Sequence, residues 1–262
     1  MLNKIRAYVE ALRPGGKSGP RIVFLHLPRT GGTALVKDIL FANFPKSRWC
    51  HVNFGPAREP LGGAHDPLSW PAWRRGRIGL LAGHMPFGFA EHFPGPSEYV
   101  TLVRDPIARV ISDYYFCRKN PSNPAHEAAT ALSLREFVER GYASSQNCYA
   151  RWLSNAVFGA KFHDQNEMLQ SAMNNLAQFS FIGITEQFDL SVERLCQRYG
   201  LAPQATSEAN RNDATPEARH VSEEEHEVLN RLNKLDLIIY AECQRRFAGL
   251  LTGESAAGAP AH

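Results

Sequence analysis

The segment from residue 21 to residue 33 constrains the fold of this chain more than any other. It reads Arg-Ile-Val-Phe-Leu-His-Leu-Pro-Arg-Thr-Gly-Gly-Thr, an apolar run that ends at a proline and two glycines before a helical pattern begins. This order predicts a buried strand, a tight turn and a helix. Glycines let the backbone curl around a ligand, and the unpaired N–H groups of a first helical turn attract anions. The segment therefore predicts an anion-binding loop.

This loop differs from the Walker A sequence. Walker A places Lys and then Ser or Thr directly after the second glycine of a longer spacer. Here the cation is Arg29, which precedes both glycines. A nucleotide kinase or ATPase on the same fold is therefore only an alternative, because its Lys-Ser/Thr pair is missing.

Composition bounds the choice of ligand. The 262 residues carry a net charge of +3, which is too mild for a general nucleic-acid binder. The cations are nevertheless 22 arginines against seven lysines. The planar fork of arginine suits phosphate, sulfate and carboxylate, so the excess fits an anionic ligand. A GC-rich genome would produce the same excess.

The cysteines and the apolar segments indicate the compartment. The five cysteines form no C-x-x-C pair, which argues against a disulfide scaffold or a zinc site and favours a reducing compartment. No apolar stretch approaches the ~20 residues that span a bilayer, and residues 1–13 lack the features of a signal peptide. We expect a soluble, cytoplasmic protein without a membrane span.

Apolar runs alternate with helical patterns along the chain. Strands are expected at 21–27, 49–53, 78–83, 99–103 and 179–185. Helices are expected at about 33–44, 106–119, 133–140, 146–157 and 165–178. A further helix is expected to follow the last strand and end at about 199, and one long helix is expected to begin at a capping box at 222–225 and end at about 247. The alternation predicts an α/β fold with a central parallel sheet flanked by helices on both faces.

We expect a single domain over residues 21–250. Residues 1–20 read as a helix with a flexible lead-in, and residues 251–262 are rich in small residues and predict a disordered tail. Residues 45–77 read as irregular apart from the short strand, and residues 120–128 read as a polar stretch.

Three candidate sites follow strands of the expected sheet. The glycine loop (residues 28–33) follows the first strand, His84 follows Gly83 at the end of another, and Arg104 ends a third, with Ser112 about two helical turns beyond it. Ligands bind beyond the carboxyl ends of parallel strands, so the three sites should converge. Arg104 and Ser112 could grip one phosphate. The alternative is a local ion pair of Arg104 with Asp105 and a solvated serine.

Three blocks together resemble the sulfotransferase family, in particular the heparan sulfate 2-O-sulfotransferase type. They are His-Leu-Pro-Arg-Thr-Gly-Gly-Thr at 26–33, Val-Arg-Asp-Pro-Ile-Ala-Arg-Val-Ile-Ser-Asp-Tyr-Tyr at 103–115, and Phe-Ile-Gly-Ile-Thr-Glu-Gln-Phe at 181–188. The resemblance implies a soluble, bacterial-type enzyme that depends on 3′-phosphoadenosine 5′-phosphosulfate (PAPS). It also implies a P-loop NTPase-like three-layer fold with extra C-terminal helices.

The resemblance assigns roles to the candidate residues. The glycine loop would hold the 5′-phosphosulfate, and Arg104 and Ser112 the 3′-phosphate. Arg29 stands where the family usually has Lys; it can stabilise charge on the leaving phosphate, but it cannot donate a proton at neutral pH. His84 would be the catalytic base, with a hydrogen-bonded structural histidine as the alternative. The cofactor-binding loop consists of Pro28, Arg29, Thr30, Gly31, Gly32 and Thr33.

Further candidates carry less sequence support. Asn147 and Arg151 lie one helical turn apart and resemble an acceptor-facing helix of the family, although a solvated face is equally compatible. Arg211 lies in a polar loop where relatives close over the nucleotide, so the resemblance makes it a candidate for an additional phosphate contact. The 2-O type has a second histidine where this chain has Ala82, so a two-histidine mechanism is not expected. The other histidines, His26 included, read as structural or surface residues.

We therefore expect in-line transfer of a sulfuryl group to an acceptor hydroxyl, with PAPS as donor and 3′-phosphoadenosine 5′-phosphate (PAP) as product. No metal is expected, because the sequence lacks a metal-ligand pattern. A carbohydrate acceptor is expected by family analogy alone. Besides a kinase or ATPase, the alternative is a non-catalytic nucleotide- or glycan-binding protein, which Arg29 in place of Lys leaves open. The oligomeric state does not follow from the sequence.

Overall fold

The centre of the molecule is a five-stranded, parallel β-sheet. The computed structural model describes residues 19–54, 66–203 and 221–253. The sheet order is β2-β3-β1-β4-β5, and every neighbouring pair is parallel. The strands are β1 (Arg21–Leu25), β2 (Trp49–Asn53), β3 (Leu80–His84), β4 (Ser97–Val103) and β5 (Phe179–Ile184). The expected α/β fold with a central parallel sheet is confirmed.

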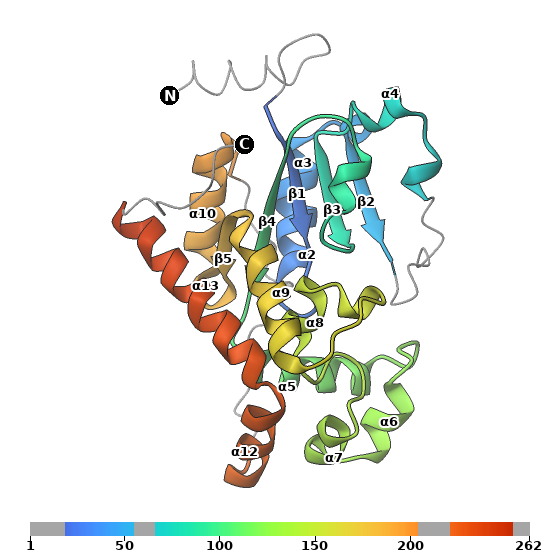
Figure 1. Ribbon diagram of the computed structural model, residues 1–262, viewed down its shortest axis with the longest axis vertical. Coiled ribbons are helices and arrows are strands. Elements are labelled where there is room, and N and C mark those ends of the chain that lie inside the picture. Colours follow the sequence, from blue (N-terminus) through green and yellow to red (C-terminus); the bar gives the residue numbers. More distant parts are fainter. Residues whose placement is uncertain (1–18, 55–65, 204–220, 254–262) are drawn as a thin grey trace.

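Helices cover both faces of this sheet (Figure 1). The helical segment after the glycine loop runs behind the sheet as α2 (Gly32–Ala34), a π-helical stretch (Leu35–Leu40) and α3 (Phe41–Asn43). In front of the sheet lie α8 (Cys148–Leu153), α9 (Gln165–Ala177) and α13 (Lys234–Thr252). α10 (Phe188–Tyr199) packs against β5, and a short α4 (Ala72–Arg75) precedes β3. Because both faces are covered, every residue of β1 is buried, and all of them after Arg21 are apolar.

A second group of helices lies beyond the carboxyl ends of the strands. α5 (Pro106–Lys119), α6 (His126–Ala131), α7 (Leu134–Glu139) and α12 (Glu223–Leu232) bury a separate apolar cluster. The predicted bounds of α5 are confirmed. Asp105 caps this helix by accepting a hydrogen bond from the Ala108 N–H, and Pro106 occupies the first helical position. α6 occupies part of the stretch expected as a polar loop.

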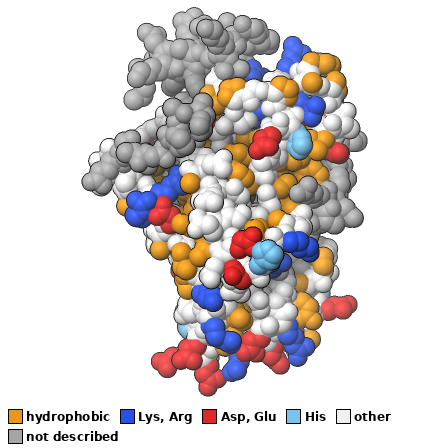
Figure 2. All heavy atoms as spheres, in the orientation of Figure 1, with side chains coloured by type: hydrophobic (Ala, Val, Ile, Leu, Met, Phe, Trp, Pro, Cys, Tyr) orange, Lys and Arg blue, Asp and Glu red, His pale blue; other side chains and the backbone are white. Residues whose placement is uncertain are grey.

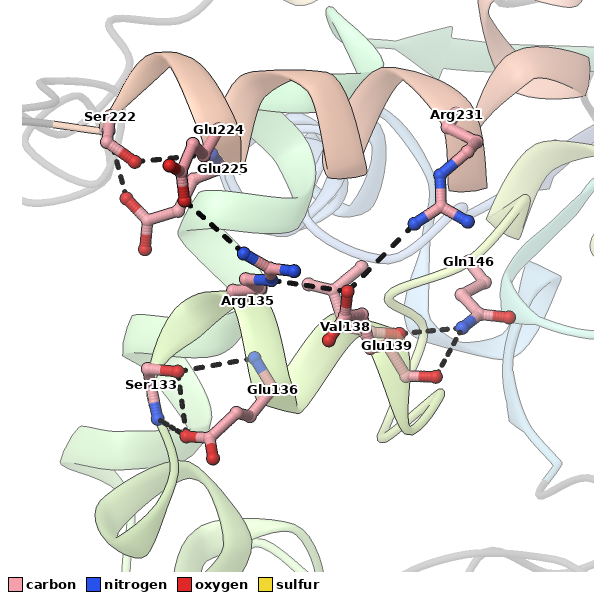
Figure 3. A network of polar contacts seen from close by, with 10 residues as sticks. All are labelled: Ser133, Arg135, Glu136, Val138, Glu139, Gln146, Ser222, Glu224, Glu225 and Arg231. Atoms are coloured by element: carbon pink, nitrogen blue, oxygen red, sulfur yellow. Dashed lines mark hydrogen bonds and ion pairs between the residues drawn. The ribbon is translucent and has the colours of Figure 1, made fainter.

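Exposed ion pairs join α7 to α12. Arg135 of α7 lies 3.4 Å from Glu224 of α12, and Arg231 of α12 lies 3.9 Å from Glu139 of α7 (Figure 3). Within α7, Arg135 also lies 3.3 Å from Glu139. Figure 2 shows acidic and basic side chains intermingled at this lower end of the molecule. Each exposed pair contributes only about 0.2–1 kcal/mol. The apolar cluster beneath them therefore does more to hold the two helices together.

The C-terminal helical region is broken at Asn233, so the expectation of one long helix is wrong. α12 and α13 meet there at an angle (Figure 1). Asn233 is fully buried, and its amide donates to the carbonyl oxygens of Ser145 and Leu229, both at 3.0 Å. Its Oδ1 accepts a hydrogen bond from the Asn147 N–H at 3.0 Å. These tertiary hydrogen bonds override the helical periodicity.

Some of the sequence predictions concern residues that lie outside the described ranges. These are nearly all of the lead-in at residues 1–20, Arg211, and the tail beyond residue 253. α13 continues to Thr252, past the expected end of the domain. None of the described helices combines the length and apolar character that crossing a bilayer requires. All five cysteines are unpaired and buried.

Candidate active site

A cavity of about 850 Å³ opens at the carboxyl ends of the strands. Its wall includes residues that follow four strands: Arg29 after β1, His84 at the end of β3, Arg104 after β4 and Thr185 after β5. They share one edge of the sheet because the strands are parallel. The three candidate sites thus converge on one cavity, as their positions at strand ends predict.

Four further predicted site residues lie in the wall of this cavity: Pro28, Gly31, Thr33 and Arg151. Thr30, Gly32 and Ser112 do not belong to this wall. Four aromatic side chains, which the sequence interpretation did not assign to the site, also belong to the wall: Phe54, Phe116, Tyr142 and Trp152.

The glycine loop turns sharply between β1 and α2. Arg29 and Gly31 have positive φ angles of 63° and 78°, a conformation that is unfavourable for most residues and natural for glycine. Thr30 is fully buried, and its hydroxyl donates to the carbonyl oxygen of Leu27, 2.9 Å away. A Cβ on Gly32 would lie 2.3 Å from the ring of His26. The loop therefore requires both glycines, for two different reasons.

Thr185 joins this loop to two neighbouring strands. Its hydroxyl oxygen lies 2.7 Å from the carbonyl oxygen of Thr30 and 2.9 Å from that of Val103. Thr185 follows β5, Thr30 follows β1, and Val103 is the last residue of β4. A single hydroxyl therefore holds three parts of the cavity wall together, a role that the sequence interpretation missed.

Arg29 is the cation of the glycine loop. Its Nε and Nη2 donate to the Oγ of Ser112 at 3.2 and 3.1 Å. Its guanidinium carbon lies 4.3 Å from the centre of the Phe116 ring, one helical turn after Ser112 on α5. The serine and the aromatic face together hold the charge beside the loop.

Arg104 brings a buried guanidinium to the cavity. The residue is only 8% exposed, yet it belongs to the cavity wall. Tyr149 fixes its backbone, because the phenol donates to the Arg104 carbonyl oxygen at 2.6 Å and accepts from the Arg104 N–H at 2.9 Å. Within the described ranges the guanidinium makes no hydrogen bond or ion pair. Burial lowers the pKa of Arg104, the Glu186 carboxylate opposes this, and the charge of Arg29 lowers it further.

His84 ends β3 with its ring in the cavity wall. Its Nδ1 lies 2.7 Å from the carbonyl oxygen of His26. Because a carbonyl only accepts, Nδ1 carries the proton and Nε2 keeps its lone pair. Burial lowers the pKa of His84; the hydrogen bond to His26 opposes this, and the charge of His51 adds to it. A neutral imidazole with a free Nε2 is suited to act as a base.

His26 was expected to be a structural or surface residue, but it is part of the site. Its ring lies in the cavity wall and stacks on the ring of His84, with centroids 4.6 Å apart and planes inclined by 17°. Burial lowers the pKa of His26 well below its usual range, and the charges of His84, His51 and Arg29 act in the same direction. The two histidines are 58 positions apart, so no local sequence pattern predicts their contact.

Asn147 and Arg151 have different environments. Asn147 precedes α8 with a φ angle of 43°, and its side-chain oxygen accepts a hydrogen bond from the Leu235 N–H at 3.1 Å. It is buried between helices and takes no part in the cavity wall. Arg151 is part of that wall. Of the two, only Arg151 can contact a ligand in this cavity.

The described residues form no candidate metal site. No three His, Cys, Asp or Glu side chains come together as a possible metal site within residues 19–54, 66–203 and 221–253. The expectation of a reaction without metal stays a prediction.

Known proteins resemble this chain over most of its length. Residues 20–241 match the model of the sulfotransferase family. Heparan-sulfate 6-O-sulfotransferase 3 from Mus musculus is 25% identical over 213 residues, covering 63% of this chain and 44% of that protein. Heparan-sulfate 6-O-sulfotransferase 2 from Homo sapiens is 22% identical over 277 residues, covering 88% of this chain and 45% of that protein. The chain thus spans about half the length of these curated relatives.

A crystal structure of the mouse sulfotransferase SULT7A1 complexed with PAP is also similar, with 16% identity and a TM-score of 0.41. The alignment covers 96% of this chain and 90% of that chain. The curated relatives named above are 6-O-sulfotransferases, so the expected family is confirmed, whereas the expected 2-O type has no support from them.

Proposed function

Because the chain belongs to the sulfotransferase family, we propose that it transfers a sulfuryl group from PAPS to a hydroxyl group of a carbohydrate. Its curated relatives are heparan-sulfate sulfotransferases, which supports a carbohydrate acceptor. Loss of the sulfuryl group would convert PAPS into PAP. The unpaired, buried cysteines support a reducing compartment such as the cytoplasm.

The buried guanidinium of Arg104 is the observation that carries this proposal. The residue is only 8% exposed, and no described residue forms a hydrogen bond with its guanidinium. Such a poorly solvated charge is unfavourable, and a phosphate placed against it would reduce that cost by charge-assisted hydrogen bonds. Arg104 and the glycine loop follow β4 and β1, which are adjacent in the sheet. A nucleotide with phosphate groups at both its 3′ and 5′ positions can therefore reach both. We assign the 3′-phosphate to Arg104 and the 5′-phosphosulfate to the glycine loop.

Ser112 remains a proposed contact to the 3′-phosphate. Its hydroxyl oxygen accepts hydrogen bonds from Arg29, and its own proton stays available to donate to a phosphate oxygen. One serine can thus serve both the loop cation and the nucleotide.

His84 acts as the base in this proposal. The acceptor hydroxyl attacks the sulfur while its proton moves to Nε2 of His84. A new O–S bond forms as the S–O bond to the 5′-phosphate breaks, and the electron pair of the broken bond goes to that phosphate. The hydrogen bond from Nδ1 to the His26 carbonyl oxygen keeps Nε2 unprotonated beforehand and stabilises the imidazolium that forms.

Arg29 and the backbone N–H groups of the glycine loop stabilise the charge that develops on the leaving phosphate. Fixed donors of this kind need no reorganisation during the reaction, which makes them effective. Arg29 stays protonated throughout, so it acts by its charge and not as an acid. Arg151 contributes to acceptor binding from α8, where Trp152 packs beside the His84 ring.

Nucleotide selectivity tests the donor. PAP, AMP and ATP with Mg²⁺ are compared at equal concentration by the rise in melting temperature that each produces. PAP should stabilise the protein most, because only PAP presents phosphates to both Arg104 and the glycine loop. Equal stabilisation by AMP would contradict the assignment, and preferential stabilisation by ATP with Mg²⁺ would favour the kinase or ATPase.

Turnover tests the base. Transfer of labelled sulfate from PAPS to desulfated heparan sulfate is measured for the wild type and for His84→Ala. The variant should lose about 100-fold or more in rate, while its affinity for PAP stays unchanged. An unchanged rate would show that His84 is not the base. A wild type that binds PAP and transfers nothing to any of a panel of glycans would favour the non-catalytic binding protein.

A further inference from the structure

The imidazole of the proposed base contacts two other rings. One face of the His84 imidazole stacks on His26, which follows β1, with centroids 4.6 Å apart. Trp152 of α8 packs against the same imidazole at 5.4 Å, tilted by 55°. His26 contributes a second contact, because its backbone carbonyl oxygen accepts the hydrogen bond from Nδ1 of His84. One residue therefore contacts the base through both its ring and its backbone.

We propose that His26 is a positioning residue for sulfuryl transfer: its ring fixes the plane of the His84 imidazole and stabilises the imidazolium that forms when His84 takes the acceptor proton. This inference rests on the proposed role of His84 as the base. It goes beyond that role because it assigns a function to a side chain that takes no part in the proton transfer.

The contacts of His26 fix the orientation of the His84 imidazole. The carbonyl oxygen of His26 fixes where Nδ1 of His84 points, and the stacked ring fixes the plane in which the imidazole lies. The two constraints leave Nε2 with one direction in which to point. Such preorganisation matters because a base must lie within hydrogen-bond reach of the proton that it removes.

The neutral charge state of His26 also favours the imidazolium of His84. The low pKa of His26 keeps its ring neutral, so it presents an aromatic face and not a second positive charge to the imidazolium of His84. A cation over an aromatic face is stabilised by the ring quadrupole. Other ionisable groups around the pair come from several elements: His51 of β2, Arg29 of the glycine loop, and Arg104, Arg151 and Asp113 in the cavity wall. Because most of these groups are cationic or neutral, a neutral His26 ring adds no further positive charge beside the imidazolium of His84.

The glycine loop supplies the space for this ring. A Cβ at Gly32 would lie 2.3 Å from Cδ2 and 2.5 Å from Nε2 of His26. The second glycine of the loop is thus required by the ring of His26, and through that ring it supports the base as well as the phosphate site.

The experiment uses NMR of ligand-free protein labelled with ¹³C and ¹⁵N in its histidines. The pKa and tautomer of His84 are measured in the wild type, in His26→Leu, which removes the aromatic face, and in His26→Phe, which keeps it. His126 serves as an internal control, because its Nδ1 also lies 3.0 Å from a carbonyl oxygen, that of Cys117, in a different part of the fold. Melting temperatures of both variants check that they fold.

In the wild type we expect the tautomer with the proton on Nδ1. His26→Leu should lower the pKa of His84 by about one unit, because the imidazolium loses its aromatic neighbour, and should slow transfer from PAPS to desulfated heparan sulfate about tenfold. His26→Phe should stay close to the wild type in both measurements. The inference is overturned if His26→Leu leaves the pKa of His84 unchanged, or if His26→Phe lowers it equally. Full transfer activity in His84→Ala would instead overturn the proposed base, whatever the NMR result.

Discussion

At the scale of single residues, the candidate site depends on polar groups that are buried with a charge or a lone pair available to the cavity. Arg104 is the strongest case. Its backbone is held at both the N–H and the carbonyl oxygen by Tyr149, whereas its guanidinium has no hydrogen-bond partner among the described residues. A rigid backbone under an unpaired cation is the arrangement expected of a residue whose partner is a ligand.

Arg104→Ala should therefore weaken PAP binding selectively. Loss of charge-assisted hydrogen bonds worth about 1.5–3 kcal/mol should raise the Kd for PAP about 10- to 100-fold, measured by isothermal titration calorimetry. The Kd for AMP, which lacks the 3′-phosphate, should change little. Arg151→Ala is the matched control, because Arg151 lies in the same cavity wall but is assigned to the acceptor. Equal weakening of PAP and AMP would contradict the assignment.

The environment of His84 predicts the pH dependence of transfer. Burial lowers the pKa of His84 from its ordinary value of 6.5, so the imidazole stays neutral, and active as a base, to a lower pH than a solvent-exposed histidine. Activity should fall only when the pH drops through this lowered pKa. The acid limb of kcat/KM against pH should consequently have its midpoint below 6.5. A midpoint above 6.5 would show that a different group controls the reaction.

At the scale of elements, local sequence signals predicted most boundaries, and tertiary contacts decided the rest. Asp105 and Pro106 mark the start of α5, and the structure has that helix at its predicted bounds. The break between α12 and α13 has no such signal. Asn233 is a polar residue inside a helical pattern, and its reason for breaking the helix is its hydrogen bonds to residues near the start of α8. Periodicity in one segment cannot report a contact with a segment more than 80 positions away.

Asn233→Ala tests whether this junction holds the helices together. Removing the side chain leaves the Ser145 carbonyl oxygen and the Asn147 N–H without their partner, which should lower the free energy of unfolding by about 2–4 kcal/mol. Urea denaturation measures the change. Asn230→Ala, on the exposed surface of α12, should change it by less than about 0.5 kcal/mol. Equal effects of the two substitutions would mean that the side-chain bonds of Asn233 are not what stabilises the break.

At the scale of the whole molecule, the site is assembled by the sheet order. The strands β3, β1, β4 and β5 are neighbours, so loops from distant parts of the sequence meet at one edge. Position at a strand end was readable from the sequence, and it predicted which loops converge. The contacts between those loops were not readable, because they join side chains 58 positions apart for His26 and His84, and 83 for Arg29 and Ser112.

Thr185 makes the longest of these connections, 155 positions along the chain to the carbonyl oxygen of Thr30. Thr185→Val keeps the shape of the side chain but removes the hydroxyl that holds the glycine loop to β4 and β5. The loop should then lose its fixed conformation, and the Kd for PAP should rise about tenfold, which corresponds to the loss of roughly one hydrogen bond.

Thr185→Ser is the matched variant, because it restores the hydroxyl and loses only a methyl group. PAP affinity in Thr185→Ser should return to within about threefold of the wild type, measured by calorimetry at a temperature where both variants are folded. Weak binding in both variants would locate the effect in packing of the methyl group. Wild-type binding in both would mean that the loop is held by its own glycines and Thr30, independently of the neighbouring strands. Only weak binding in Thr185→Val with rescue in Thr185→Ser fits a site whose parts are joined through this hydroxyl.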